Sequence, residues 1–198
     1  LAGPAAGGIL ADWGADVVKV EPPSGDPCRL FQRMLGGDMP TNPIFEMDNR
    51  SKRGIAVDLG TEEGLAIAMD LLAGADVFIT NLRIGALQRL GLDHPSIGER
   101  FPRLVYCLVT GYGSEGPDAD RAAYDIAAFW ARSGIAGLLT TPGGDPPFQR
   151  GGMGARGLQR RAWFVGAHIW SHRRHRLCAP FLMAPRVPPA VYRCTGLH

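Results

Sequence analysis

Short apolar runs alternate with amphipathic stretches along most of the chain before residue 155. The apolar runs are rich in β-branched residues and predict strands over residues 16–21, 54–59, 75–80 and 104–109. The stretches between them predict helices over residues 5–13, 61–72, 85–90, 95–100 and 124–140. Residues 28–48 show no regular period, so we expect them to be irregular.

Local signals support this division. Gly14 is suited to the C-terminal cap of the first helix, and Thr61 to the N-terminal cap of a later one. Alternation of strands and helices at this spacing predicts an α/β protein with an open parallel sheet flanked by helices, a Rossmann-like arrangement. Ligands in such folds bind beyond the carboxyl ends of the strands, which places Glu21, Asn81 and residues 110–113 at the binding edge.

Charge divides the chain into two parts. Residues 1–154 hold 13 Lys and Arg against 19 Asp and Glu, a net charge of −6. Residues 155–198 hold eight arginines and no Asp, Glu or Lys. We therefore expect an α/β domain over residues 1–154 and an atypical Arg/Pro/His-rich segment over 155–198. A basic tail favours contact with nucleic acid or a membrane surface, and packing of its aromatic residues on the domain is the competing interpretation.

Apolar runs and cysteines bear on location. The longest apolar runs fall well short of the 18 or so residues that a membrane span needs. The four cysteines lack the Cys-x-x-Cys spacing of a zinc site, and His172 and His175 have no clustered carboxylate or thiolate beside them. These features predict a cytoplasmic protein with reduced thiols, no membrane span and no metal.

Several segments together carry a family resemblance: residues 2–4, 10–23, 25–29, 49–53, 76–83, 102–106 and 111–113. In this order they resemble the family III CoA-transferases, a group that includes formyl-CoA transferase, carnitine-CoA transferase and the α-methylacyl-CoA racemases. The resemblance covers about 150 residues. It implies the large domain of that family, beginning inside a motif, and an interlocked homodimer.

The resemblance also implies a substrate and a site. CoA, as a substrate, would lie along the predicted sheet edge, with an acyl-CoA and a carboxylic acid as partners in lipid or fatty-acid metabolism. Ala2 would meet the nucleotide by its main chain, Val57 the adenine, Asn81 and Leu82 the pantetheine, Arg89 a phosphate, and Thr110 and Tyr112 the thioester. Arg83 is a further phosphate candidate, because arginine forks are suited to phosphate.

The family's nucleophile is an aspartate that attacks the thioester and forms a mixed anhydride, from which CoA leaves and returns on a second acid. It follows a Gly-rich turn, and Ala155 occupies that position in this sequence. Asp145, between glycine and proline, is typical of a turn. Tyr124 precedes Asp125 where racemases carry a His-Asp pair, which favours the transferases over a racemase-like isomerase.

From Ala155 onward the family pattern stops. We hypothesise that a frameshift, or an equivalent gene alteration, replaced the native continuation. The leading functional hypothesis is CoA transfer, with this chain supplying the CoA-binding part. A catalytically silent module that binds CoA or acyl-lipid is the alternative that Ala155 favours. Nucleic-acid binding through the tail would be non-specific.

Overall fold

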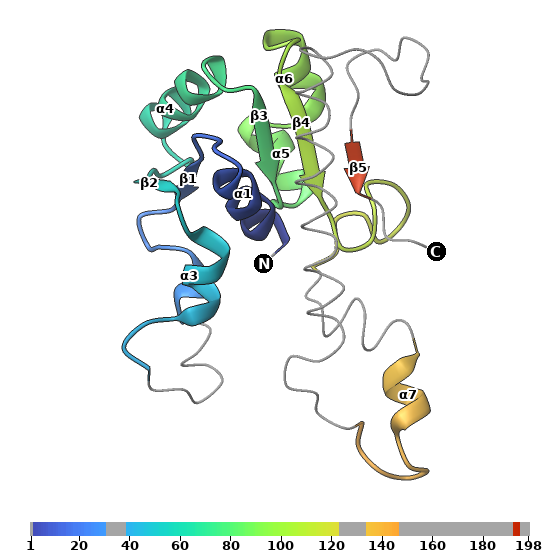
Figure 1. The fold of residues 1–198 in the computed structure, drawn as a ribbon. Coiled ribbons are helices and arrows are strands. Elements are labelled where there is room, and N and C mark those ends of the chain that lie inside the picture. Colours follow the sequence, from blue (N-terminus) through green and yellow to red (C-terminus); the bar gives the residue numbers. More distant parts are fainter. Residues whose placement is uncertain (1, 31–38, 123–133, 147–191, 195–198) are drawn as a thin grey trace, which may run out of the picture.

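The computed structural model describes residues 2–30, 39–122, 134–146 and 192–194 (Figure 1). Helices and strands alternate through most of these residues, which confirms the α/β class. In chain order the elements are α1 (Ala2–Asp12), β1 (Val18–Glu21), the 3-10 helix η1 (Pro27–Leu30), α3 (Pro43–Asn49), β2 (Arg53–Ala56), α4 (Glu62–Ala73), β3 (Val77–Thr80), α5 (Ile84–Leu90), α6 (His94–Arg100), β4 (Val105–Val109), α7 (Ile135–Leu139) and β5 (Tyr192–Cys194).

The described strands are all paired in parallel, as the sequence predicts, and they form two hydrogen-bonded sections. β1 pairs with β2, Val18 lying opposite Arg53. β3, β4 and β5 form the second section in that order, with Val77 opposite Val105 and Cys107 opposite Tyr192. Parallel strands need crossover connections, and the helices between the strands supply them.

Both faces of the β3–β4 pair are covered (Figure 1). Tyr106 and Leu108 of β4 join a cluster with residues of α4, α5 and α6, whereas Cys107 joins a second cluster with Ala6 and Leu10 of α1. Side chains of a strand alternate between its two faces, so both classes of position must be apolar when both faces are covered. This explains the uninterrupted apolar run at residues 104–109.

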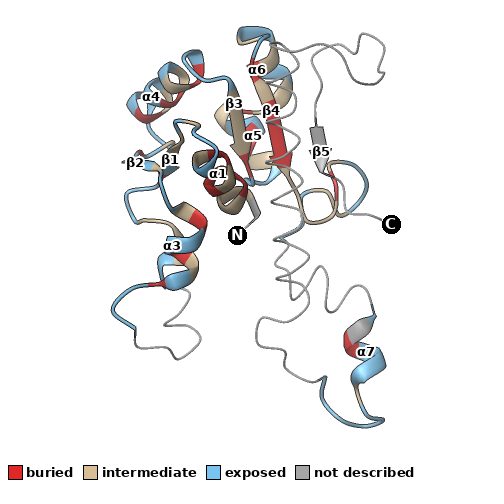
Figure 2. Ribbon diagram, in the orientation of Figure 1, coloured by how far each residue is buried: buried red, intermediate tan, exposed pale blue. Residues whose placement is uncertain are grey.

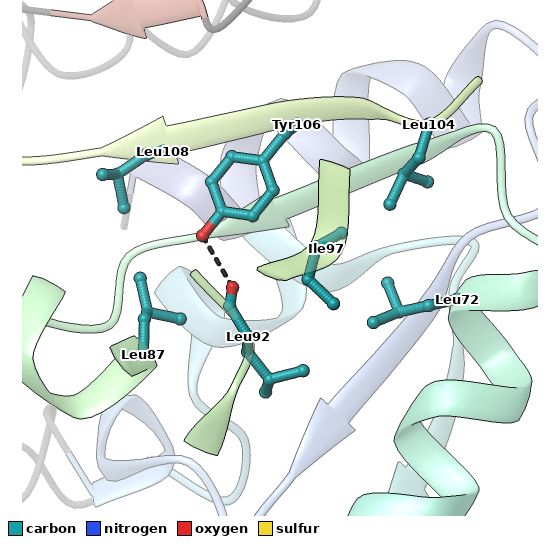
Figure 3. Packing of buried hydrophobic residues seen from close by; sticks show 7 residues of the cluster. All are labelled: Leu72, Leu87, Leu92, Ile97, Leu104, Tyr106 and Leu108. Carbon is teal, nitrogen blue, oxygen red and sulfur yellow. Dashed lines mark hydrogen bonds between the residues drawn. The ribbon is translucent and has the colours of Figure 1, made fainter. Parts of the chain in front are cut away.

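The larger cluster is centred on Leu87, Ile97 and Tyr106 (Figure 3). Leu87 and Ile97 are each 1% exposed. The Tyr106 hydroxyl is buried with them and donates a hydrogen bond of 2.8 Å to the Leu92 carbonyl oxygen. This bond satisfies the one polar atom that the tyrosine brings into the core.

The signals that mark the end of α1 and the start of α4 are confirmed. Gly14 has a φ of 89°, in the left-handed region that favours glycine, and its amide donates to the Ala11 carbonyl oxygen. Thr61 precedes α4, and its hydroxyl oxygen accepts a hydrogen bond of 3.0 Å from the Gly64 amide.

Two predictions of element bounds were wrong, and one strand was not expected. Residues 28–48, expected to be irregular, contain most of η1 and of α3, which Asn42 caps by accepting hydrogen bonds from the Ile44 and Phe45 amides. Seven residues are too few for a helical period to be recognised. β2 spans residues 53–56 and not 54–59. The unexpected strand is β5. Residues 124–133 of the helix predicted over 124–140 lie outside the described residues.

Burial differs among the elements (Figure 2). α1 and β4 carry several buried residues, whereas α7 has Ala136 buried and Leu138 85% exposed. None of the helices in the described ranges reaches the length and apolarity that a membrane crossing requires.

Candidate functional site

The carboxyl ends of β3 and β4 lie side by side. Thr80, the last residue of β3, is paired with Leu108 of β4, so Asn81 and Thr110 leave the sheet at the same edge. The Thr80 side chain is buried, and its hydroxyl oxygen accepts a hydrogen bond of 3.3 Å from the Leu82 amide. The turn that carries Asn81 and Leu82 is thereby held to the end of the strand.

The first turn of α1 meets the same edge. A Cβ placed on Gly3 would lie 3.9 Å from the Asn81 Cβ and 4.0 Å from its side-chain oxygen. The backbone of residues 2–4 therefore lies beside Asn81, although it is separated from it by more than 70 residues of sequence. This brings two of the positions singled out from the sequence, Ala2 and Asn81, to one place.

A pocket of about 390 Å³ opens where the β3–α5 turn meets the segment after β4. Three of the predicted site residues, Leu82, Arg83 and Arg89, line it together with Ala86 and Asp120. Both arginines are exposed, and Leu82 is 41% exposed. Two guanidinium groups against one carboxylate make the pocket suited to an anionic ligand with an apolar part.

The segment after β4 is folded back by its own hydrogen bonds. The Thr110 hydroxyl oxygen accepts a hydrogen bond of 3.0 Å from the Gly113 amide. Gly113 has a φ of 95°, which a residue with a side chain rarely adopts. Tyr112 is half-buried inside this turn. Thr110 and Tyr112 thus lie in a defined turn at the carboxyl edge, as the sequence predicts.

A second pocket, of about 370 Å³, lies at the ends of β1 and β2. Its walls are formed by Glu21, Pro22, Pro23, Gly25 and Arg29 on one side and by residues 54–56 on the other. Val57 follows immediately, is 5% exposed, and donates a backbone hydrogen bond of 2.8 Å to the Glu21 carbonyl oxygen. Val57 is therefore next in sequence to a wall of this second pocket, and it does not line the pocket that contains Leu82 and Arg89.

Arg29 lines this second pocket, although it is not among the residues singled out from the sequence. Its guanidinium makes two hydrogen bonds to the Glu21 carboxylate, at 2.9 and 2.8 Å, and lies 4.1 Å from the centre of the Phe45 ring. These contacts fix one side of a side chain that is 51% exposed. The signal was available, because Arg29 ends the segment 25–29 that carries part of the family resemblance.

Glu21 and Asp26 are held as carboxylates by their neighbours. The hydrogen bond from Arg29 lowers the pKa of Glu21, and the Asp26 amide and Lys19 act in the same direction. Burial alone would raise the pKa of Asp26, but hydrogen bonds from Lys19 and the Cys28 amide outweigh it and lower that pKa. The predicted edge residue Glu21 thus organises this loop.

Lys52 joins the start of α1 to α3. Its ammonium group donates hydrogen bonds to the carbonyl oxygens of Pro4 and Asp48, both at 2.7 Å, and to the Asn49 side-chain oxygen at 3.0 Å. Gly7 lies against it, since a Cβ there would be 3.2 Å from the Lys52 Cε. Burial lowers the pKa of Lys52 to about 8. Lys52 therefore ties the start of α1 to α3.

The predicted catalytic position, Ala155, lies outside the described residues, as do Tyr124, Asp125, His172 and His175. Asp145 is described and exposed. Within the described ranges no group of three or more His, Cys, Asp or Glu side chains could hold a metal ion.

Known proteins resemble this chain over the same region. A family profile described as CoA-transferase family III matches residues 1–155. A cinnamoyl-CoA:phenyllactate CoA-transferase of Clostridium sporogenes is 40% identical over 156 residues, covering 78% of this chain and 38% of the relative. A succinate–glutarate CoA-transferase of Agrobacterium fabrum is 42% identical over 151 residues, covering 74% and 38%.

A solved structure shares the fold. The crystal structure of a CAIB/BAIF family protein from Brucella suis matches with a TM-score of 0.71 and 37% identity, over 89% of this chain and 47% of that one. The chain therefore spans less than half the length of the proteins that it matches.

Proposed function

The chain belongs to CoA-transferase family III, and from that premise we propose that it binds the CoA portion of an acyl-CoA thioester during transfer of CoA to a carboxylic acid. The observation that carries the proposal is the pocket formed by Leu82, Arg83 and Arg89 at the carboxyl edge of β3 and β4. CoA combines phosphates with a pantetheine arm that carries methyl and methylene groups beside its amides, which matches an exposed leucine beside two arginines.

The remaining site residues divide between the two pockets. Asn81 and the backbone at Ala2 adjoin the first pocket, which we call the arginine pocket after Arg83 and Arg89. Thr110 and Tyr112 would face the thioester. Val57, which follows a wall of the second pocket, would lie near the adenine, with Arg29 as an additional anion contact.

Turnover in this family, as proposed here, requires an aspartate that forms a mixed anhydride, and Ala155 has no carboxylate with which to do so. We accordingly propose that the chain as written binds CoA without transferring it. The family profile ends at residue 155, which supports a boundary between residues 1–154 and a replaced segment at 155–198. Reading the gene in its other frames past codon 154 tests this, since a frame that continues the family pattern with an aspartate is expected.

We further propose a cytoplasmic homodimer acting in lipid or fatty-acid metabolism. One relative, from Mycobacterium tuberculosis, is described as a probable fatty acyl-CoA transferase, which supports that setting. Sedimentation of the purified chain tests the dimer, and a monomer at all concentrations would contradict it.

Calorimetric titration of the 198-residue chain with CoA tests the function. Arg89→Ala and Asn81→Ala are expected to weaken binding, the arginine change by about tenfold to a hundredfold, the effect of losing a charged hydrogen bond worth about 1.5–3 kcal/mol. Arg103→Ala is the control, because Arg103 is exposed next to the opposite end of β4.

A transfer assay then separates the hypotheses. Binding without turnover supports a silent CoA-binding module, and turnover supports a complete transferase. A chain that neither binds CoA nor turns it over would contradict both.

A further inference from the structure

Asp120 supplies a hydrogen bond that α5 lacks locally. The first amides of a helix have no partner within the helix, and a capping side chain usually accepts from one of them. The residue before α5 is Arg83, whose side chain makes no capping bond. The Gly85 amide instead donates to the Asp120 carboxylate at 3.1 Å, across 35 residues of sequence.

Gly85 leaves room for this close approach. A Cβ on Gly85 would lie 3.2 Å from one carboxylate oxygen of Asp120 and 3.6 Å from the other. Gly85 is not among the residues with positive φ, so its backbone conformation does not call for glycine. A side chain at position 85 would require the Asp120 carboxylate to move by a few tenths of an ångström.

The contact joins two parts of the candidate site. Gly85 follows the turn that carries Leu82 and Arg83. Asp120 lies near the end of the 110–121 segment, which contains Thr110 and Tyr112. Hydrogen bonds within that segment run from Gly113 to Thr110 and from Ala119 to Gly116. Asp120 also lines the arginine pocket itself.

We propose that Asp120 is a positioning residue that fixes the 110–121 segment to the start of α5, so that the thioester-side turn and the arginines face one pocket. The inference rests on the proposed function for the identity of the ligand, CoA. The carboxylate of Asp120 is negatively charged and lies beside Arg83 and Arg89, so it opposes phosphate binding. Asp120 therefore does not attract the ligand. Its role is to hold the 110–121 segment in position.

Hydrogen exchange of the 198-residue chain, without and with CoA, tests the proposal. Asp120→Ala is expected to speed exchange of the Gly85 amide and of residues 110–116 by about tenfold or more. Asp120→Asn keeps an oxygen acceptor and is expected to retain the protection. Gly85→Ala is expected to weaken the protection in part, because its methyl group makes the carboxylate move by a few tenths of an ångström.

CoA supplies the functional readout. In the unaltered chain, CoA is expected to increase protection of residues 110–116. In Asp120→Ala that increase is expected to be lost. A structural role confined to α5 would leave the CoA-induced protection in place.

Asp93→Ala is the matched control, since Asp93 precedes α6 and accepts a hydrogen bond of 2.8 Å from Ser96 away from the pocket. It should leave residues 110–116 unchanged. Unaltered exchange at Gly85 and at 110–116 in Asp120→Ala overturns the proposal, as does a large loss of CoA affinity without a change in exchange. Absence of CoA binding by the unaltered chain would contradict the proposed function alone, because exchange in the free chain still decides the role of Asp120.

Discussion

The Arg29 guanidinium makes a bidentate pair of hydrogen bonds to the Glu21 carboxylate. The Arg29 Nε donates to the Glu21 Oε2 at 2.9 Å, and the Arg29 Nη2 donates to the Glu21 Oε1 at 2.8 Å. The carboxylate is 10% exposed, and its Oε2 also accepts from the Asp26 amide at 2.9 Å. A planar guanidinium held in this way has a fixed orientation. The pair therefore determines the shape of the pocket at the ends of β1 and β2.

Replacing Glu21 with Gln is expected to lower the free energy of unfolding by about 1–2 kcal/mol, because the charge of a buried carboxylate in a bidentate pair is lost. Asp16→Asn is the control. Asp16 makes the same kind of pair with Arg53, but both side chains are about 70% exposed, and exposed pairs contribute little. Equal effects of the two changes in chemical denaturation would contradict the importance of burial here.

Acid should weaken the same pair. Because the pKa of Glu21 is lowered in the folded chain from its ordinary value of 4.5, the unfolded chain takes up the proton first as the pH falls. The stabilisation by the Glu21–Arg29 pair is therefore complete above about pH 4.5 and is lost as the pH falls below that value. Unfolding free energies of the native chain and Glu21→Gln should converge in that range, and a constant difference would contradict the prediction.

Lys52 should give a pH dependence of the same sign, in an alkaline range. Its pKa is about 8 in the folded chain and 10.5 ordinarily, so between these values the unfolded chain binds more protons. The stability of the native chain relative to Lys52→Met is therefore expected to rise from pH 8 to 10.5, by up to about 1.4 kcal/mol per pH unit. Denaturant unfolding at several pH values measures it, and a flat difference would show that burial does not perturb this amine.

Tyr106→Phe is expected to cost about 1–2 kcal/mol at neutral pH, because the buried Leu92 carbonyl loses its donor. Burial raises the pKa of Tyr106 to about 12, from an ordinary value of 10. The unfolded chain thus loses the proton first, and the stability of the native chain relative to the variant should fall between pH 10 and 12. A relative stability that does not change with pH would place the hydroxyl in contact with solvent.

Leu87→Ala tests the core behind the site. Leu87 is 1% exposed and packs among α4, α5, α6 and β4, so its truncation should leave a cavity and cost about 2.7–5 kcal/mol. Leu138→Ala, at a residue 85% exposed, should change stability by less than about 0.5 kcal/mol. Thermal or denaturant unfolding compares the two, and similar values would contradict the assigned core.

The prediction from sequence succeeded where the physics is local. The apolar run at 104–109, the Thr61 cap and the Gly14 turn each depend on neighbouring residues, and each is confirmed. It failed at α3, whose seven residues are stabilised by the Asn42 cap and by contacts with α1 and show no period of their own.

The candidate site shows the same division. Residue types and motif order singled out Leu82, Arg83 and Arg89, and these do line one pocket. Val57 was chosen in the same way, but it lies at the other pocket, because β2 pairs with β1 and not with β3. Arg29 was missed, since an arginine after a proline-rich turn looks like a solvated charge until Glu21 and Phe45 are seen around it.

The sequence by itself determined the alternation of helices and strands, the parallel pairing, and the motifs that identify the family. Those features follow from residue spacing and from preferences that act over a few residues. Only the tertiary structure decided that Asp120 caps α5 through Gly85, that Lys52 ties α1 to α3, and that the site divides into two pockets. These are contacts between residues far apart in the chain, and the chain's packing, which no local pattern encodes, brings them within hydrogen-bond distance.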